Sequence, residues 1–126
     1  GRLKDEIRHF TVQTFGYPLS APLAEIRTPA GFEVSCQYTV PQAMTAFLES
    51  VDFEDAIRKA ISLGGDSDTL ACMTGAIAEA FYRSIPPIVE TAVFQRLDAR
   101  LAAITREFRA RYPLSPHKTS GLPERR

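Results

Sequence analysis

The chain has 126 residues and no net charge, because 15 lysines and arginines balance 15 aspartates and glutamates. This length suits one domain with a core of its own, and the balanced charge gives no electrostatic reason to expect a nucleic acid or a membrane as partner. No apolar run approaches the roughly 18 residues that span a bilayer, and the first residues are charged rather than signal-like. We therefore expect a soluble protein.

Cysteine usage indicates a reducing compartment. Cys36 and Cys72 lie in segments that we expect to be buried, and one possible pair makes no disulfide framework. Neither histidine has an evident link to a thiol, so we interpret both cysteines as small buried side chains rather than nucleophiles. The cytoplasm is the predicted location. Because the sequence starts at Gly1 rather than Met, we expect a fragment or a processed product.

The first half of the chain predicts two helices separated by an irregular segment. Apolar residues at helical spacing indicate an amphipathic helix over residues 3–15, which Gly16 ends. Residues 17–36 contain three prolines and are expected to be irregular. Thr39 then serves as the predicted N-cap of a helix whose first turn holds Pro41.

The middle of the chain predicts a second pair of helices. Asp52 is a good N-cap, and Asp55 stands three residues later in a position resembling a capping box. Gly64-Gly65 ends this helix, and the next one follows at once. Its predicted buried stripe is accompanied by a flank of small residues that allows another helix to come close. The stripe consists of Leu70, Met73, Ile77 and Phe81, and the flank of Ala71, Gly75 and Ala78.

The last third predicts a helix over residues 88–95, a longer final helix, and a disordered tail over 113–126. Arginines on the final helix are interpreted as solvated surface rather than an anion site. With no strand pattern, the fold class is all-α, with short helices packed at mixed angles. The final helix is marked by Leu97, Leu101, Ile104, Phe108 and Tyr112, and its arginines are Arg106, Arg109 and Arg111.

Two carboxylates and a hydroxyl follow the glycine pair, and this cluster is the candidate site. Asp66, Asp68 and Thr69 offer three oxygen ligands of the kind that Mg²⁺ prefers, at a helix start that also suits phosphate oxygens. The plainer alternative is that Asp66, Ser67 or Asp68 only caps the following helix. An EF-hand is excluded, because Ala71 and Ile77 stand where that loop needs glycine and glutamate.

The residues around this cluster resemble the C-terminal half of the ADP-ribosylglycohydrolase family, which includes the dinitrogenase-reductase-activating glycohydrolase. The resemblance rests on the run from Phe53 to Thr69, on Gly75 to Tyr82 and on Ile85-Pro86, and it extends upstream to Ser35 and downstream to Tyr112. It implies an all-helical, orthogonal multi-helix bundle, of which residues 1–112 would form the C-terminal part.

The same resemblance implies a two-Mg²⁺ centre, with Mn²⁺ in some members, that hydrolyses the bond between ADP-ribose and a protein side chain or related acceptor. Asp66, Asp68 and Thr69 match the C-terminal metal ligands of the family, and Gly65 and Ser67 would lie against the substrate. For Gly65, a role as helix C-cap is an equally good explanation. The family's second ligand set, a Thr-Asp-Asp run, is absent from this sequence.

Two functional hypotheses follow. In the first, the chain supplies one half of the metal site of an ADP-ribosyl hydrolase, and its partners are an ADP-ribosylated protein or an ADP-ribose-like small molecule together with the missing N-terminal half or another chain. In the second, it is a non-catalytic helical module that binds an ADP-ribose-like ligand or a protein. No catalytic base is assigned within the chain.

Overall fold

A computed structural model describes residues 2–27 and 35–113, and the chain divides into two compact units, residues 1–84 and 85–126, each of which is described by itself. All regular elements of the described ranges are helices, which confirms the all-α prediction. No helix within these ranges is both long and apolar enough to cross a membrane.

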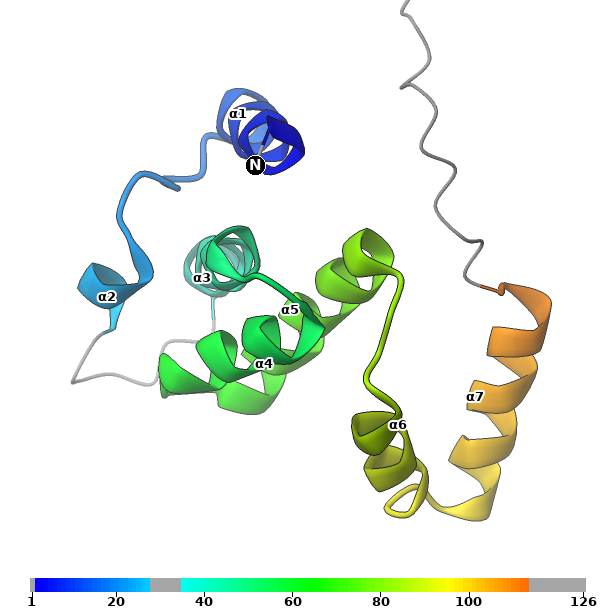
Figure 1. Cartoon of the computed structure of the whole chain (residues 1–126). Coiled ribbons are helices and arrows are strands. Elements are labelled where there is room, and N and C mark those ends of the chain that lie inside the picture. The colour runs from blue at the N-terminus through cyan, green and yellow to red at the C-terminus, as the bar shows by residue number, and fades with distance from the viewer. Residues whose placement is uncertain (1, 28–34, 114–126) are drawn as a thin grey trace, which may run out of the picture. The chain divides into compact units, whose positions relative to one another are not determined.

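The described residues of the first unit include five helices, whose arrangement is shown in Figure 1, and a buried hydrophobic cluster lies among the second to the fifth. Helix α3 packs on both α4 and α5, and those two helices pair along their length as a hairpin. The second unit has two helices in its described part. In chain order the helices are α1 (Arg2–Phe15), α2 (Leu23–Ile26), α3 (Cys36–Glu49), α4 (Phe53–Ser62), α5 (Ser67–Tyr82), α6 (Pro87–Phe94) and α7 (Ala99–Arg111).

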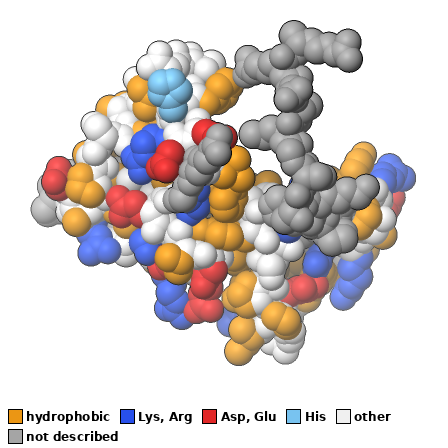
Figure 2. Space-filling view, turned by 45° about the horizontal axis from the view of Figure 1, so that its top comes forward, with side chains coloured by type: hydrophobic (Ala, Val, Ile, Leu, Met, Phe, Trp, Pro, Cys, Tyr) orange, Lys and Arg blue, Asp and Glu red, His pale blue; other side chains and the backbone are white. Residues whose placement is uncertain are grey.

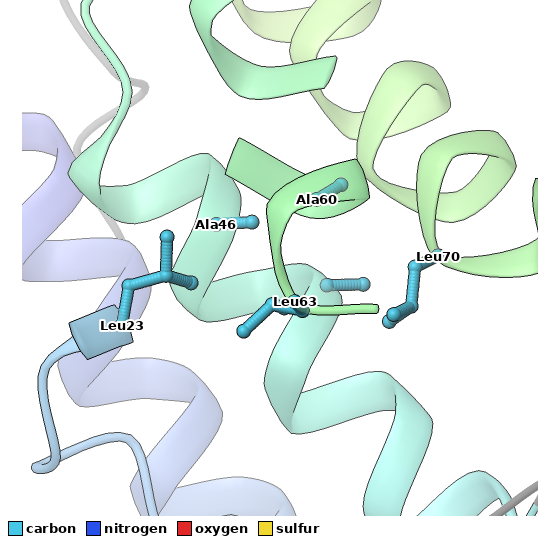
Figure 3. Close-up of a cluster of buried hydrophobic side chains, with 6 residues drawn as sticks. Leu23, Ala46, Ala60, Leu63 and Leu70 are labelled. Atoms are coloured by element: carbon cyan, nitrogen blue, oxygen red, sulfur yellow. The ribbon is translucent and has the colours of Figure 1, made fainter. Parts of the chain in front are cut away.

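One cluster in the core of the first unit is built from small and medium-sized side chains. Leu63, directly after α4, lies between Leu23 of α2 and Leu70 of α5 (Figure 3), while alanines let the helix backbones approach. Partly buried Ile26 and Met73 pack against the same cluster. Burial of each leucine contributes about 1.5–3 kcal/mol to folding. The cluster consists of Leu23, Ala43, Ala46, Ala60, Leu63 and Leu70.

The predicted smooth flank of α5 allows the close pairing with α4. A Cβ atom added to Gly75 would lie 3.0 Å from Cδ1 of Ile57, so the two helices meet where one of them has no side chain. The buried face of α5 consists of Leu70, Thr74 and Ala78, and Thr74 donates a buried hydrogen bond of 3.2 Å to the Ala43 carbonyl of α3. The predicted stripe of α5 is thus rotated, because Met73 and its neighbours along the stripe are only partly buried.

Helix α4 begins as the sequence predicts. The Asp52 side chain accepts a 2.8 Å hydrogen bond from the Asp55 N–H, and Asp55 in return accepts one of 2.9 Å from the Val51 N–H. Lys59 forms an ion pair with Asp55 one turn later, at 2.6 Å. This pairing and the N–H bond hold the pKa of Asp55 below its ordinary value of 3.8, against the opposing effect of burial.

Three sequence-based expectations about the first unit are wrong. Residues 23–26 form α2, because the Leu23 side chain is buried and its N–H donates a 2.8 Å hydrogen bond to Glu49. Helix α3 begins at Cys36, one turn before the predicted cap Thr39, whose N–H bonds back to the Ser35 carbonyl. Pro41 therefore stands inside the helix. Residues 28–34 of the expected irregular segment lie outside the described residues.

The thiols are also placed differently from the prediction. Cys36 and Cys72 are both exposed. Cys36 occupies the first position of α3, and Cys72 lies on α5 away from the face of Leu70 and Thr74 that enters the core. Apolar character alone did not distinguish the buried face of α5 from its exposed face, because apolar and small residues occur around much of the helix surface.

The second unit agrees with the predicted helices to within a residue or two. Asp98 caps α7 by accepting a 2.8 Å hydrogen bond from the Leu101 N–H. Arg106 and Arg111 are exposed, as expected, although Arg106 lies over the ring of Phe94 at 4.9 Å. Arg109 is only partly exposed, because it pairs with Glu90 of α6. These two contacts join α6 to α7. The tail beyond residue 113 lies outside the described residues.

The contact at Gly75 predicts a size limit in the α4–α5 pair. We expect Gly75→Leu to destabilise the protein by about 1–3 kcal/mol through overpacking against Ile57. Gly75→Ala is the matched control, because its gain in helix propensity of about 0.5–1 kcal/mol offsets a small shift of the Ile57 methyl. Thermal unfolding of the three proteins provides the comparison. Equal melting temperatures for the leucine and alanine variants would show that the helices are not in close contact here.

The lowered pKa of Asp55 predicts a pH-dependent contribution to stability. A carboxylate whose pKa is depressed on folding stabilises the protein above its unfolded pKa, and this stabilisation is lost as the pH falls through the folded value, here below 3.8. Asp55→Asn should therefore destabilise the protein equally at pH 7 and pH 5, and less at pH 3. Urea unfolding at the three pH values measures this, with Glu54→Gln in the exposed pair with Arg58 as control. A constant difference down to pH 3 would contradict the ion-pair explanation.

Candidate functional site

The turn between α4 and α5, together with the first helical residues of α5, carries all the residues of the predicted metal site. Helix α4 ends with the Gly64 N–H donating to the Ile61 carbonyl at 3.1 Å. Gly64 and Gly65 then adopt φ angles of +77° and +63°, which side-chain-bearing residues rarely adopt. The Ser67 N–H donates to the Gly65 carbonyl at 2.9 Å, which closes the turn. The glycine pair is therefore required by the backbone, as predicted for a helix stop.

Buried side chains on both sides hold this exposed turn. Leu63 precedes it with 7% of its surface exposed and Leu70 follows with 2%, and both belong to the core cluster. The Leu70 N–H also donates to the Asp66 carbonyl at 3.0 Å, which begins α5. Six residues thus connect two anchored points. Because both flanking leucines are buried, the backbone between them is held in one geometry even though the turn itself is exposed.

Asp66 stands at the N-cap position of α5, but its side chain makes no cap hydrogen bond. Asp52 and Asp98, at the same position of α4 and α7, both accept a hydrogen bond of 2.8 Å from the N–H three residues later. The plain capping explanation therefore accounts for those two aspartates and not for the side chain of Asp66. The Asp66 carboxylate, on a partly buried residue, therefore does not serve the helix end.

The structure brings Asp66 and Asp68 together. The neighbouring Asp66 side chain is the main cause of a pKa of Asp68 below its ordinary value of 3.8, and backbone N–H groups of Thr69 and of Asp68 itself act in the same direction. The Thr69 N–H lies 3.1 Å from Asp68 Oδ1. Two carboxyl groups this close favour occupation by a cation, since their repulsion is otherwise relieved only by a shared proton.

The donor chemistry of the turn fits part of a hard-cation site. Asp66, Asp68 and Thr69 present carboxylate and hydroxyl oxygens, and the last two are exposed. Within residues 2–27 and 35–113, no group of three or more His, Cys, Asp or Glu side chains is placed to hold a metal. Mg²⁺ requires near-octahedral coordination, so further ligands must come from water, substrate or another polypeptide segment.

Two other residues predicted for the site differ in accessibility. Gly65 is exposed, and a Cβ atom added to it would meet nothing within 4 Å, so its backbone is open to a ligand. Ser67 is partly buried as the first residue of α5. No sequence pattern predicts a further contact near the site. Arg27 donates a 2.8 Å hydrogen bond to Ser62 Oγ, which connects the end of α4 to the residue after α2.

The contrast between Asp66 and the two capping aspartates predicts stability effects of different size. Asp52→Ala and Asp98→Ala should each lower the free energy of unfolding by about 0.5–2 kcal/mol, because each removes a cap bond. Asp66→Ala should change it by less than about 0.5 kcal/mol, because no such bond is lost. Chemical denaturation of the three variants in metal-free buffer measures the difference. A loss at Asp66 equal to that at Asp52 would mean that Asp66 does cap α5.

The chain was compared with protein families, with curated proteins and with solved structures. An uncharacterized protein from Archaeoglobus fulgidus is 38% identical over 56 residues, which cover 44% of this chain and 18% of that protein. The matched segment is thus less than a fifth of that relative. No solved structure matches the chain. The sequence profile of the family described as ADP-ribosylglycohydrolase matches residues 5–114, which include α1 to α7 almost completely. The match also includes the whole of residues 64–69, here called the acidic turn. The chain therefore belongs to the ADP-ribosylglycohydrolase family.

Proposed function

We propose that this chain provides part of the active site of a Mg²⁺-dependent hydrolase that releases ADP-ribose from a protein side chain or a related ADP-ribosyl conjugate. In this proposal, Asp66, Asp68 and Thr69 hold one side of a dinuclear metal centre. Gly65 and Ser67 lie against the substrate. The other ligands come from a second polypeptide segment, because the sequence contains no Thr-Asp-Asp run.

The observation that carries the proposal is the side chain of Asp66. It occupies an N-cap position without capping, whereas Asp52 and Asp98 cap their helices. It instead approaches a second carboxylate, that of Asp68. Family membership supplies the reaction class, and the unused carboxylate supports the assignment of these residues to its metal site.

In the proposed reaction, the residues of this chain hold the metal ions and leave room for the substrate. Bound divalent cations orient hydroxyl groups of the ribose and activate water for attack at the anomeric carbon. Asp66 and Asp68 supply the negative charge that retains the cations, and Thr69 adds a neutral oxygen. The glycine pair leaves the turn free of side-chain bulk on the side from which a ligand approaches.

The alternative proposal is a non-catalytic helical module that binds an ADP-ribose-like ligand or a protein. It is supported by the absence of a complete ligand cluster among the described residues. Exposed apolar side chains on α7 also support it, since such surfaces are typical of interaction sites. On the face seen in Figure 2, hydrophobic side chains lie among both signs of charge. The exposed residues of α7 are Leu101, Ile104 and Phe108.

Metal binding by the turn is tested directly with paramagnetic Mn²⁺. We expect Mn²⁺ to broaden the backbone amide signals of residues 65–70 in an NMR spectrum of the chain, with millimolar affinity because the ligand set is incomplete. Mg²⁺ should compete. Asp68→Asn should abolish the local broadening, whereas Asp98→Asn, which changes an exposed cap aspartate elsewhere, should not. Equal broadening in the Asp68 variant would remove the metal role from this turn.

The hydrolase activity is tested on the protein isolated from its source, with whatever segments accompany this chain there. We expect Mg²⁺-dependent release of ADP-ribose from an ADP-ribosylated protein, measured by chromatography of the free nucleotide. Asp66→Ala should reduce the rate by at least about 100-fold, as expected for a metal ligand. Asp98→Ala is the matched control. Release that persists in the Asp66 variant contradicts the assigned role, and no release by any form favours the binding module.

A further inference from the structure

The ammonium group of Lys4 lies among oxygen atoms and aromatic rings, which no pattern in the sequence predicts. Its Nζ atom donates hydrogen bonds to the carbonyl oxygens of Phe47, at 2.8 Å, and Ser50, at 2.5 Å. A third bond of 2.8 Å goes to the hydroxyl of Tyr82, and Ser50 Oγ lies at 3.4 Å. The three protons of the ammonium group thus each have an oxygen partner.

Aromatic rings complete this environment. The Lys4 Nζ atom lies 4.7 Å from the ring centroid of Phe47, 5.5 Å from that of Phe81 and 5.1 Å from that of Tyr82. All three distances are within the range of a cation–π interaction. The rings also pack edge to face on one another, with centroids 5.1–6.3 Å apart. Three faces that favour a cation are therefore held in place by their own contacts.

The oxygen atoms are arranged without the help of Lys4. The Tyr82 hydroxyl donates to the Ser50 carbonyl at 2.9 Å, and the Ser50 hydroxyl donates to the Phe47 carbonyl at 2.6 Å. Both carbonyls lie at the C-terminal end of α3, where the helix dipole places partial negative charge. The Phe47 carbonyl also accepts a 3.1 Å hydrogen bond from the Ser50 N–H. Helices α3 and α5 alone thus present a preformed acceptor for a cation.

Helix α1 depends on this contact. Its apolar side chains Leu3 and Phe10 are 42% and 55% exposed, so they do not dock the helix on the core. The side that faces inward instead carries buried Thr11, and Lys4 reaches from it to α3 and α5. Lys4, together with the hydrogen bond from Arg8 to the Leu19 carbonyl, provides the polar attachment of α1.

We propose that Phe47, Ser50, Phe81 and Tyr82 form a binding site for primary alkylammonium ions, and that Lys4 is its resident occupant. The rings attract any cation, whereas the three oxygen atoms accept three hydrogen bonds from one nitrogen. A primary ammonium has three N–H groups, so the site should favour it over cations with fewer N–H groups. This site lies at the C-terminal end of α5, whereas the acidic turn precedes its N-terminal end. The proposal does not rest on the metal or hydrolase assignment.

The test uses chemical rescue of Lys4→Ala in the full 126-residue chain. This substitution leaves Cβ and removes three methylene groups and the ammonium, which together correspond to n-propylammonium. We expect the melting temperature to fall by roughly 5–10 °C. Added n-propylammonium chloride should then raise it in a saturable manner, by about 2–3 °C at a concentration equal to the dissociation constant.

Three controls define the site. Potassium chloride at equal concentration corrects for ionic strength, 1-propanol for the apolar stem, and tetramethylammonium for charge without N–H donors. The wild-type chain, whose site is filled, should show no n-propylammonium rescue. Lys4→Met keeps a stem of the same length and lacks only the ammonium group, so it serves if the alanine variant does not fold, with the ammonium ion itself as the added cation.

The proposal is overturned if the wild type and the Lys4 variants respond equally to the ammonium salt, or if potassium chloride or 1-propanol has the same effect. Tyr82→Phe combined with Lys4→Ala should bind n-propylammonium several-fold more weakly, because the ring remains and one acceptor is lost. Unchanged rescue in that double variant also contradicts the proposed site.

Discussion

The close approach of α4 and α5 is the constraint on which the acidic turn depends. Gly75 removes the side chain that would otherwise meet Ile57, and this permits the two helices to pack along their length. Leu63 and Leu70 are then drawn into one cluster, so both ends of the intervening turn are fixed. A larger residue at Gly75 would separate the helices and also move the two leucines. The geometry of Asp66 and Asp68 is thus set by packing some distance away from them.

The sequence predicted this region well because its signals are local. An N-cap aspartate, a helical stripe and a glycine pair act within a few residues, and Asp52 and Gly64 take the predicted roles. The same local reasoning did not decide whether Asp66 is a cap or a ligand, since both roles place an aspartate before a helix. The side-chain geometry argues against the capping role, because Asp66 makes no cap hydrogen bond.

Features that depend on distant parts of the chain were not predictable from pattern. Glu49 bonds the start of α2 across 26 residues, and the contact from Lys4 to Tyr82 spans 78. Helix α1 is the clearest case, because its apolar spacing predicts that Leu3 faces inward and charged residues face solvent. The structure exposes Leu3 and directs Lys4 inward. A lysine is stabilised there only because α3 supplies carbonyl oxygens and α5 supplies rings, neither of which periodicity reveals.

Helix α5 connects the two polar features of the first unit. It begins directly after Asp66 and ends at Tyr82, whose hydroxyl accepts a bond from the ammonium of Lys4. Negative charge near its N-terminus and positive charge near its C-terminus both complement the helix dipole. Between these ends, Thr74 bonds to α3 and Gly75 contacts α4, so the helix is held along its length. A rigid element of this kind is suited to carry ligands for a cation, because neither end is free to relax when the carboxylates repel each other.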